Sequence, residues 1–176
     1  GTQKCMGAPP GLSPITVSPR AFEIAMSRTT KVASWYQDWG LRARYWGGEH
    51  LYHHTVPVNL LLGLREAVRQ ILEEGLEARF ARHRSVSASL IGGLGELGIS
   101  PFAAEGYRLP TLNSVTIPAG VDDAQVRGDL LREYGLEIGG GLGALKGKVW
   151  RIGTMGESAT QRNVTLLLGA LEGLLE

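Results

Sequence analysis

The longest regular pattern of apolar positions lies in the middle of the chain, in the stretch "PVNLLLGLREAVRQILEEG". Its hydrophobic residues recur three and four positions apart, which is the spacing of one buried face of an α-helix. Thr55 is a good N-cap, Pro57 fits the first turn, and Gly75 stands where helices commonly end on glycine. The pattern therefore predicts a helix that closes at Gly75 and a second helix from about Leu76 to Leu97.

Shorter segments on either side of these two helices carry the patterns of further strands and helices. We expect strands at 13–19, 109–118, 136–141 and 148–154, and helices at 18–28, 122–134 and 160–175. The aromatic stretch from Trp35 to Trp46 is expected to be irregular and to cover another part of the molecule. A small sheet with helices packed on one face is the simplest α+β arrangement of these elements.

The composition indicates a globular protein that handles small molecules. Of the 176 residues, 43% are hydrophobic, which is enough to bury a core. Eighteen Lys and Arg residues balance seventeen Asp and Glu residues without a basic block, so neither a nucleic acid nor an anionic membrane surface is indicated as a partner. No apolar run approaches the length of a membrane span. Cys5 is the single cysteine, which excludes an internal disulfide and a multi-cysteine metal site and is compatible with a reducing compartment.

Two glycine-rich stretches resemble nucleotide-binding loops but lack their context. The sequence "GLGELG" at 93–98 matches a dinucleotide-binding pattern, yet it follows a helical segment, so we interpret it as a helix end. The sequence "GGGLGALKGK" at 139–148 ends like a phosphate loop, but Leu142 and Val149 stand where that motif needs Gly and Ser or Thr. This second stretch is either a flexible hairpin or a loop that borders a ligand, because glycine lets the backbone approach closely.

Histidines and hydroxyl side chains gather just before the long helix. His50, His53 and His54 lack the spacing and the acidic neighbours of a metal site, so we expect no metal there. Tyr52 and Thr55 place two hydroxyls beside the helix N-terminus, where free backbone N–H groups favour an anion such as phosphate. The alternative is that Thr55 only caps the helix and that Tyr52 is a packed aromatic.

Lys4 lies just ahead of a Gly-Ala-Pro-Pro-Gly corner, on a loop that leads into the first expected strand. The stretches "TQKCMGAPPG", "YHHTVPV", "RLPT", "EIGGGLG" and "GKVWRIGTMG" follow one another in an order and at separations that resemble the C-terminal half of the alanine:glyoxylate (serine:pyruvate) aminotransferases. These are class V, fold-type I enzymes that use pyridoxal 5'-phosphate. The resemblance covers essentially the whole chain. It implies an α/β fold in which residues 1–74 end the large cofactor domain and residues 75–176 form a small α+β domain.

The resemblance also implies roles for five residues. Lys4 corresponds to the lysine that forms the Schiff base with the cofactor and then carries a proton as a base. Gln3 corresponds to a side-chain donor to the cofactor phosphate, and Tyr52 and Thr55 correspond to hydroxyls that reach this phosphate from the neighbouring subunit of a homodimer. Arg151 corresponds to the arginine that binds the substrate carboxylate. Without the resemblance, Lys4 and Arg151 would be interpreted as surface side chains.

The strand pattern around Arg151 bears on that role. Side chains alternate between the two faces of a strand, so "KVWRIG" places Arg151 on the same face as Val149 and opposite Trp150. The face that carries the arginine is therefore not plainly a solvent-facing one.

The implied activity is the transfer of an amino group from a small amino acid such as alanine or serine to glyoxylate or pyruvate, in the cytoplasm or in the matrix of a peroxisome or mitochondrion. In this family the ring-stacking aromatic, the carboxylate that pairs with the pyridinium nitrogen and the glycine-rich phosphate loop precede the lysine, so we expect the 176 residues alone to be inactive. One alternative is a non-catalytic module that binds no cofactor. Another is a cysteine desulfurase, which would need a nucleophilic cysteine on a small-domain loop, and residues 75–176 contain no cysteine.

Overall fold

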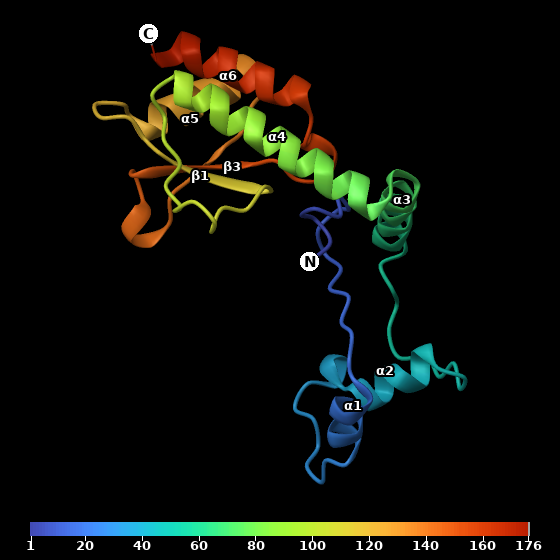
Figure 1. Cartoon of the computed structure of the whole chain (residues 1–176). Coiled ribbons are helices and arrows are strands. Elements are labelled where there is room, and N and C mark those ends of the chain that lie inside the picture. Colours follow the sequence, from blue (N-terminus) through green and yellow to red (C-terminus); the bar gives the residue numbers. More distant parts are fainter. Residues whose placement is uncertain (176) are drawn as a thin grey trace.

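The computed structural model describes residues 1–175, which form two parts joined by extended chain (Figure 1). The helices are α1 (Pro19–Met26), α2 (Trp39–Trp46), α3 (Val58–Glu74), α4 (Leu76–Glu96), α5 (Asp123–Tyr134) and α6 (Gln161–Leu175). The strands are β1 (Leu112–Thr116), β2 (Gly139–Gly140) and β3 (Val149–Gly153), and three 3₁₀ turns are η1 (Trp35–Gln37), η2 (Gly143–Leu145) and η3 (Gly156–Ser158). In Figure 1, α4, α5 and α6 lie together on one side of the strands, whereas α1 and α2 form a separate lobe reached by two extended segments.

β3 is the central strand of the sheet, and both of its neighbours run antiparallel to it in the order β1-β3-β2. Arg151 of β3 lies between Ser114 of β1 and Gly139 of β2. The glycine-rich stretch between β2 and β3 contains the short turn η2, so it is a hairpin connection. The predicted arrangement, a small sheet with helices on one face, is confirmed.

The hydrophobic core fills the space between the sheet and the helices on that face. Its largest fully buried side chain is Trp150 of β3, whose indole N–H donates to the Asp123 carboxylate of α5 at 3.0 Å. The buried members of this core run from Val86 to Leu171, so residues 1–74 add no buried side chain to it. Gly93 allows α4 and α6 to pack closely, because a Cβ at this position would collide with Leu168.

A chain of buried polar groups crosses the core beside these apolar contacts. The hydroxyl of Ser87 in α4 donates to Asn113 Oδ1 of β1 at 2.7 Å, and Asn113 Nδ2 donates to Thr154 Oγ1 at 3.2 Å. The Thr154 hydroxyl donates in turn to the carbonyl of Pro110 at 2.9 Å. Because a buried polar group without a partner is costly, this chain fixes the end of β3 against α4.

The junction of α3 and α4 is held by ion pairs around Glu74, the last residue of α3. Arg79 Nη1 donates to Glu74 Oε2 at 2.7 Å, and Arg82 donates from Nε to Oε1 at 2.5 Å and from Nη2 to Oε2 at 2.9 Å. Gly75 stands between the two helices with φ of +82°, a conformation that favours glycine. The hydrogen bonds from Arg82, and then those from Arg79, lower the pKa of Glu74 to about 2.

Most of the predicted elements are confirmed. The helices expected at 18–28, 122–134 and 160–175 are α1, α5 and α6, and the long periodic region forms α3 and α4 with the break at Gly75. The "GLGELG" stretch contains the end of α4, as expected, and its last residue, Gly98, has φ of +72°.

Two predicted segments are wrong. Residues 13–19 do not form a strand, because a strand needs the hydrogen bonds of a neighbouring strand and nothing within residues 1–175 pairs with this segment. The stretch from Trp35 to Trp46 is not irregular but forms η1 and α2. Asp38 caps α2 by accepting hydrogen bonds from the N–H groups of Gly40 and Leu41, at 2.9 and 3.1 Å, which stabilises this short aromatic helix.

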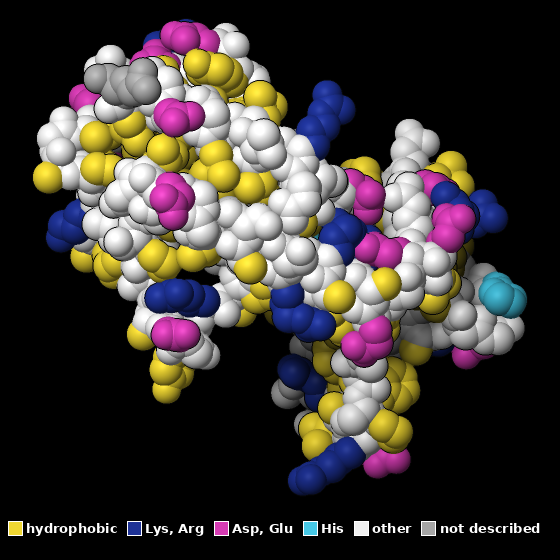
Figure 2. All heavy atoms as spheres, turned by 45° about the horizontal axis from the view of Figure 1, so that its top comes forward, with side chains coloured by type: hydrophobic (Ala, Val, Ile, Leu, Met, Phe, Trp, Pro, Cys, Tyr) yellow, Lys and Arg dark blue, Asp and Glu magenta, His cyan; other side chains and the backbone are white. Residues whose placement is uncertain are grey.

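The surface carries both signs of charge and several large apolar side chains. On the face shown in Figure 2, Lys and Arg side chains are interspersed with Asp and Glu side chains. Large exposed apolar residues of the first half of the chain include Ile15, Ile24, Trp35, Trp46 and Leu62. In the part of the chain that the structure describes, no helix combines the length and the apolar character needed to cross a membrane.

Leu130 and Leu131 are neighbours on α5 that test the position of the core. Leu130 is fully buried, whereas Leu131 is 53% exposed. We expect Leu130→Ala to lower the free energy of unfolding by roughly 2–5 kcal/mol, because it leaves a cavity, and Leu131→Ala to change it by no more than about 0.5 kcal/mol. Chemical denaturation of the two variants measures the difference, and equal losses would contradict the packing described for α5.

Glu74 predicts a pH dependence of stability. Its pKa is lowered from 4.5 to about 2 in the folded protein, so its ion pairs stabilise the fold fully above about pH 4.5, and this contribution is lost as the pH falls towards 2. We expect Glu74→Gln to be less stable than the parent at neutral pH, with a difference that shrinks across this pH window. Urea denaturation at several pH values measures it.

Glu66 of α3 supplies a matched control for that experiment. Its pKa is also lowered to about 2, chiefly by a hydrogen bond from Arg69, but this pair lies on the exposed surface of α3. Solvent and salt screen exposed pairs, so Glu66→Gln is expected to have a much smaller effect. Equal effects of the two variants would contradict a special role of Glu74 at the helix junction.

Candidate functional site

Lys4 lies on a tight turn near the start of the described chain. The N–H of Gly7 donates to the Lys4 carbonyl at 2.9 Å, and Gly7 has φ of +74°. The turn is anchored on both sides, because Thr2 and Ala8 are buried and the Ala8 N–H donates to the Thr2 carbonyl at 3.0 Å. The side chains of Gln3 and Lys4 are exposed. The backbone of the turn is therefore fixed, while both predicted cofactor-binding side chains remain accessible.

Two other parts of the chain pack against this turn. Arg79 of α4 donates from Nη2 to the carbonyl of Cys5 at 2.9 Å. Gly156 of η3 lies so close that a Cβ there would be 3.3 Å from Gly7 Cα and 3.4 Å from the Lys4 carbonyl oxygen. The Gly156 N–H donates to His83 Nε2 of α4 at 3.1 Å, which holds the loop after β3 in this place.

Arg151 lies on the sheet face opposite the hydrophobic core. Its strand neighbours Trp150 and Ile152 belong to the core, so the predicted alternation is confirmed. Arg151 is partly buried, and its Nε donates to the Gly140 carbonyl of β2 at 2.7 Å. A Cβ on Gly139 would lie 3.2 Å from Arg151 Nη2, so the glycines of β2 give the guanidinium room to lie along the strand.

Tyr52 and Thr55 present two hydroxyls that are hydrogen-bonded to each other. The distance between Tyr52 Oη and Thr55 Oγ1 is 2.9 Å, and both residues are exposed. Neither structural alternative holds: Tyr52 is 69% exposed rather than packed, and Thr55 does not cap α3. The N-cap of α3 is Pro57, which gives no side-chain cap hydrogen bond, so the prediction of Thr55 as the cap is wrong. The extended backbone before Pro57 places Thr55 too far ahead of the helix.

The neighbouring histidines hold this segment in place. The His53 ring stacks on Trp35 with a centroid distance of 4.0 Å, and His53 Nε2 contacts the Trp35 carbonyl oxygen at 3.2 Å. His53 Nδ1 and His54 Nδ1 are 2.8 Å apart. Burial, and then the charges of His53 and Arg42, lower the pKa of His54. These contacts give the histidines a packing role beside the exposed hydroxyl pair.

The five predicted site residues thus form three groups in the structure. Gln3 and Lys4 share one turn, Tyr52 and Thr55 share a hydrogen bond, and Arg151 lies on β3. Within residues 1–175, no hydrogen bond joins one group to another. The closest link runs through the loop that follows β3, because this loop touches the turn of Lys4.

Sequence reasoning missed the residues that support the turn of Lys4. Arg79 and His83 stand in a helical pattern where charged side chains usually face solvent, yet both are buried. The signal that could have identified them is their spacing: Arg79, Arg82 and His83 lie three and four positions apart on one face of α4.

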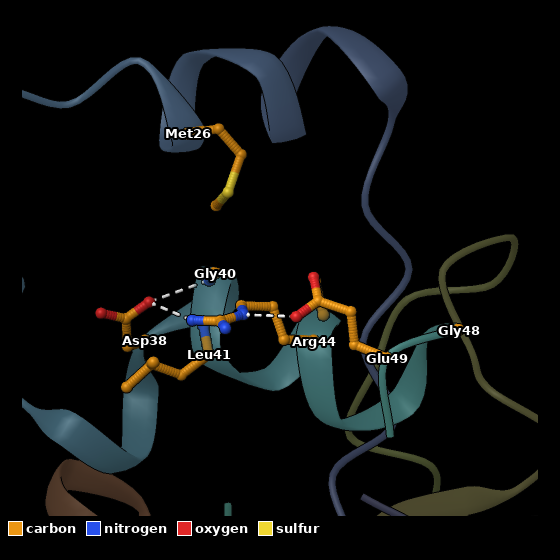
Figure 3. A pocket seen from close by; sticks show the side chains of 8 residues that line it. Met26, Asp38, Gly40, Leu41, Arg44, Gly48 and Glu49 are labelled. Atoms are coloured by element: carbon orange, nitrogen blue, oxygen red, sulfur yellow. Dashed lines mark hydrogen bonds and ion pairs between the residues drawn. The ribbon is translucent and has the colours of Figure 1, made fainter. Parts of the chain in front are cut away.

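A hollow of about 460 Å³ between α1 and α2 contains none of the predicted residues (Figure 3). Its charged side chains already have partners. Arg44 pairs with Glu49 at 2.9 Å, and Asp38 accepts the two capping hydrogen bonds of α2. We therefore assign no chemistry to this hollow.

Comparison with known proteins identifies relatives along the whole chain, although no family model matches it. The (S)-ureidoglycine–glyoxylate transaminase of Bacillus subtilis is 39% identical in an alignment of 193 positions, which covers 99% of this chain and 46% of that protein. The alanine–glyoxylate aminotransferase of Drosophila melanogaster is 42% identical in an alignment of 180 positions, which covers 100% of this chain and 46% of that protein. The chain therefore spans about half the length of the curated relatives it matches.

Solved structures give the same answer for the fold. The alanine–glyoxylate aminotransferase of Nostoc sp. superimposes on this chain with a TM-score of 0.96 at 48% sequence identity. The superposition covers 99% of this chain and 46% of the Nostoc chain. The ureidoglycine–glyoxylate aminotransferase of Bacillus subtilis gives a TM-score of 0.96 at 42% identity, and the pyridoxamine–pyruvate aminotransferase of Mesorhizobium loti gives 0.89 at 32%. Each of these two superpositions covers 99% of this chain and 45% of the other chain. These neighbours are fold-type I aminotransferases, so the fold class expected from the motifs is confirmed. Over its whole length, the chain is homologous to about half of the alanine–glyoxylate and ureidoglycine–glyoxylate aminotransferases.

Proposed function

We propose that the chain is the C-terminal half of a pyridoxal-phosphate-dependent aminotransferase that moves an amino group from a small amino acid, such as alanine or serine, to glyoxylate or pyruvate. The observation that carries the proposal is the turn of Lys4. Its backbone is anchored by buried neighbours and by Arg79, while the lysine amine is accessible. Relatives that are alanine–glyoxylate and ureidoglycine–glyoxylate aminotransferases support the substrate class.

Lys4 supplies the covalent attachment in this proposal. Pyridoxal phosphate, when bound, supplies an aldehyde that reacts with an amine and a ring that stabilises negative charge at the substrate Cα. The Lys4 amine would hold the cofactor through this aldehyde, with loss of water, and once free it would be the base that takes the proton from the substrate Cα. A fixed backbone beneath the lysine restricts where its amine can reach, which is what a positioned base requires.

Gln3, Tyr52 and Thr55 have the donor chemistry that a phosphate needs. The Gln3 amide is exposed beside Lys4, and the hydroxyls of Tyr52 and Thr55 lie 2.9 Å apart on exposed side chains. They stand just before the start of α3, whose first N–H groups have no side-chain cap. We propose that this hydroxyl pair completes the phosphate site of a neighbouring subunit in a homodimer, with Gln3 and Lys4 on the other subunit.

Arg151 is the proposed binding group for the substrate α-carboxylate. Its Nε is held by the Gly140 carbonyl, and within the described residues its two Nη groups make no hydrogen bond. A guanidinium offers parallel donors that match the two oxygens of a carboxylate. Held in place by Nε, the side chain would bind the carboxylate through its free end.

The domain division follows the break at Gly75. We propose that residues 1–74 belong to the large cofactor domain and residues 75–176 form the small domain. The core that runs from Val86 to Leu171 supports this division. The proposed location is the cytoplasm or an organelle matrix, and the free thiol of Cys5 is compatible with either.

Reduction with borohydride tests the assignment of Lys4. In the complete protein loaded with pyridoxal phosphate, we expect reduction to fix the cofactor on Lys4, as measured by mass spectrometry of the digested protein. Lys4→Arg should abolish the label, whereas the control Lys148→Arg should keep it. A label on Lys31, Lys146 or Lys148 in the parent protein would contradict the assignment of Lys4. The absence of any label would favour a module that binds no cofactor.

Substitution of Arg151 tests the carboxylate site. Loss of a hydrogen bond to a charged group is worth roughly 1.5–3 kcal/mol, so Arg151→Ala should slow the half-reaction with the amino donor at least about tenfold. Arg151→Lys should recover part of the loss, because an ammonium keeps the charge but not the fork. The cofactor should still be fixed on Lys4 in both variants.

The control for that substitution is Arg132→Ala on α5. Arg132 also pairs with a carboxylate, that of Asp129, but it lies on the exposed surface. Single-turnover kinetics should be unchanged in Arg132→Ala. If Arg151→Ala also kept the parent rate, Arg151 would be a structural arginine and not a substrate-binding one.

A further inference from the structure

We propose that Arg79 is a positioning residue for Lys4: its guanidinium fixes the turn that carries the lysine and ties this turn to the loop that follows Arg151. The proposal rests on the proposed function of Lys4. Arg79 touches neither Lys4 nor the site's other predicted residues, so it acts through the backbone of the turn.

The burial of Arg79 is the first observation behind this role. Only 4% of the residue is exposed, although a charged guanidinium is rarely so buried unless it is paired. Its acceptors come from three separate parts of the chain: Glu74 Oε2 at 2.7 Å, Glu157 Oε1 at 3.3 Å and the Cys5 carbonyl at 2.9 Å. The buried charge is thus neutralised by two carboxylates, and its remaining contact is to the turn.

The contact with Cys5 is placed where it controls the turn. Cys5 follows Lys4 directly, and the bond from the Gly7 N–H to the Lys4 carbonyl closes the turn around it. A hydrogen bond to the Cys5 carbonyl fixes the orientation of the next peptide plane, because that carbonyl is part of the plane. Without Arg79 this plane can rotate, and the closing hydrogen bond and the direction of the Lys4 side chain change with it.

Glu157 connects Arg79 to the loop that follows β3. It lies in η3, on the loop that follows β3, and this loop already touches the turn through Gly156. By binding both Cys5 and Glu157, the guanidinium links the turn of Lys4 to the end of the strand that carries Arg151. The distance between the proposed base and the proposed carboxylate site thus depends on Arg79.

Arg82 offers a close comparison on the same helix. It also binds Glu74, and it donates to the carbonyls of Gly156 and Ala159 at 3.0 and 2.8 Å. It makes no hydrogen bond to residues 1–11 within the described chain. Because Arg82 keeps Glu74 paired, loss of Arg79 leaves no isolated carboxylate there, and we expect Arg79 variants to fold.

The experiment compares Arg79→Met, Arg79→Lys and Arg82→Met with an exposed control, Arg69→Met. Arg69 binds Glu66 and Glu73 on the surface of α3 and lies outside the network. In the complete protein without cofactor, hydrogen exchange of the peptide that spans residues 1–11 reports on the turn. With cofactor bound, the pH midpoint of the cofactor absorbance reports on the surroundings of Lys4.

Arg79→Met is expected to speed exchange in this peptide about tenfold, as the loss of one charge-assisted hydrogen bond implies, and to move the absorbance midpoint by about half a pH unit. Arg79→Lys should restore part of both signals, since an ammonium can still reach one acceptor. Arg82→Met should leave both signals near the parent values, even if it lowers the free energy of unfolding as much as Arg79→Met does. Arg69→Met should change neither signal.

Equal exchange in Arg79→Met and Arg82→Met, compared at equal global stability, would overturn the proposal and leave Arg79 a structural arginine. A shift of the absorbance midpoint without a change in exchange would overturn it too, because the effect would then not pass through the turn. If borohydride fixed the cofactor on another lysine, the proposed function would fail, while the exchange data would still report on the contact between Arg79 and Cys5.

Discussion

The carboxylate of Glu74 organises the region where the junction of α3 and α4, the turn of Lys4 and the loop after β3 meet. Glu74 ends α3 and binds two arginines of α4. Of these, Arg79 also donates to the turn of Lys4, and Arg82 also donates to the loop after β3. Arg79 would be costly to bury without this counter-charge. The sharp change of direction at Gly75, the lysine turn and the loop that follows the central strand are therefore held by one connected set of ion pairs.

The sheet contributes a second constraint, which acts on Arg151. Trp150 and Ile152 bury one face of β3 under the helices, so the residue between them must lie on the opposite face. On that face the glycines of β2 leave space for a guanidinium and offer a carbonyl to hold it. The packing of the core thus decides where the proposed carboxylate site lies, and the polar chain from Ser87 to Pro110 fixes the end of the same strand.

The sequence predicts the parts of this structure that depend on local pattern. The helices α3 to α6 follow from apolar spacing and from glycine at helix ends, and the face of Arg151 follows from strand alternation. Patterns that need a distant partner mislead: residues 13–19 have strand composition but no partner strand among the described residues. The helix α2 has a local signal that could have predicted it, because Asp38 is a good N-cap residue and stands directly before this helix.

The support for Lys4 could not be predicted, because it comes from contacts between residues far apart in the chain. Arg79 lies 74 positions from Cys5 and 78 from Glu157. The motifs predict which residues form the proposed site, whereas the structure shows which contacts hold these residues in place. The Thr55 prediction illustrates the difference, since Thr55 is suited to a helix cap, but its hydroxyl bonds with Tyr52.

A crystal structure of the complete protein with pyridoxal phosphate would test the proposed cofactor site directly. We expect continuous density between the cofactor and the Lys4 amine, with the phosphate bound by Gln3 of one subunit and by Tyr52 and Thr55 of the other. A cofactor attached to a different lysine, or a phosphate bound far from Gln3, Tyr52 and Thr55, would contradict it.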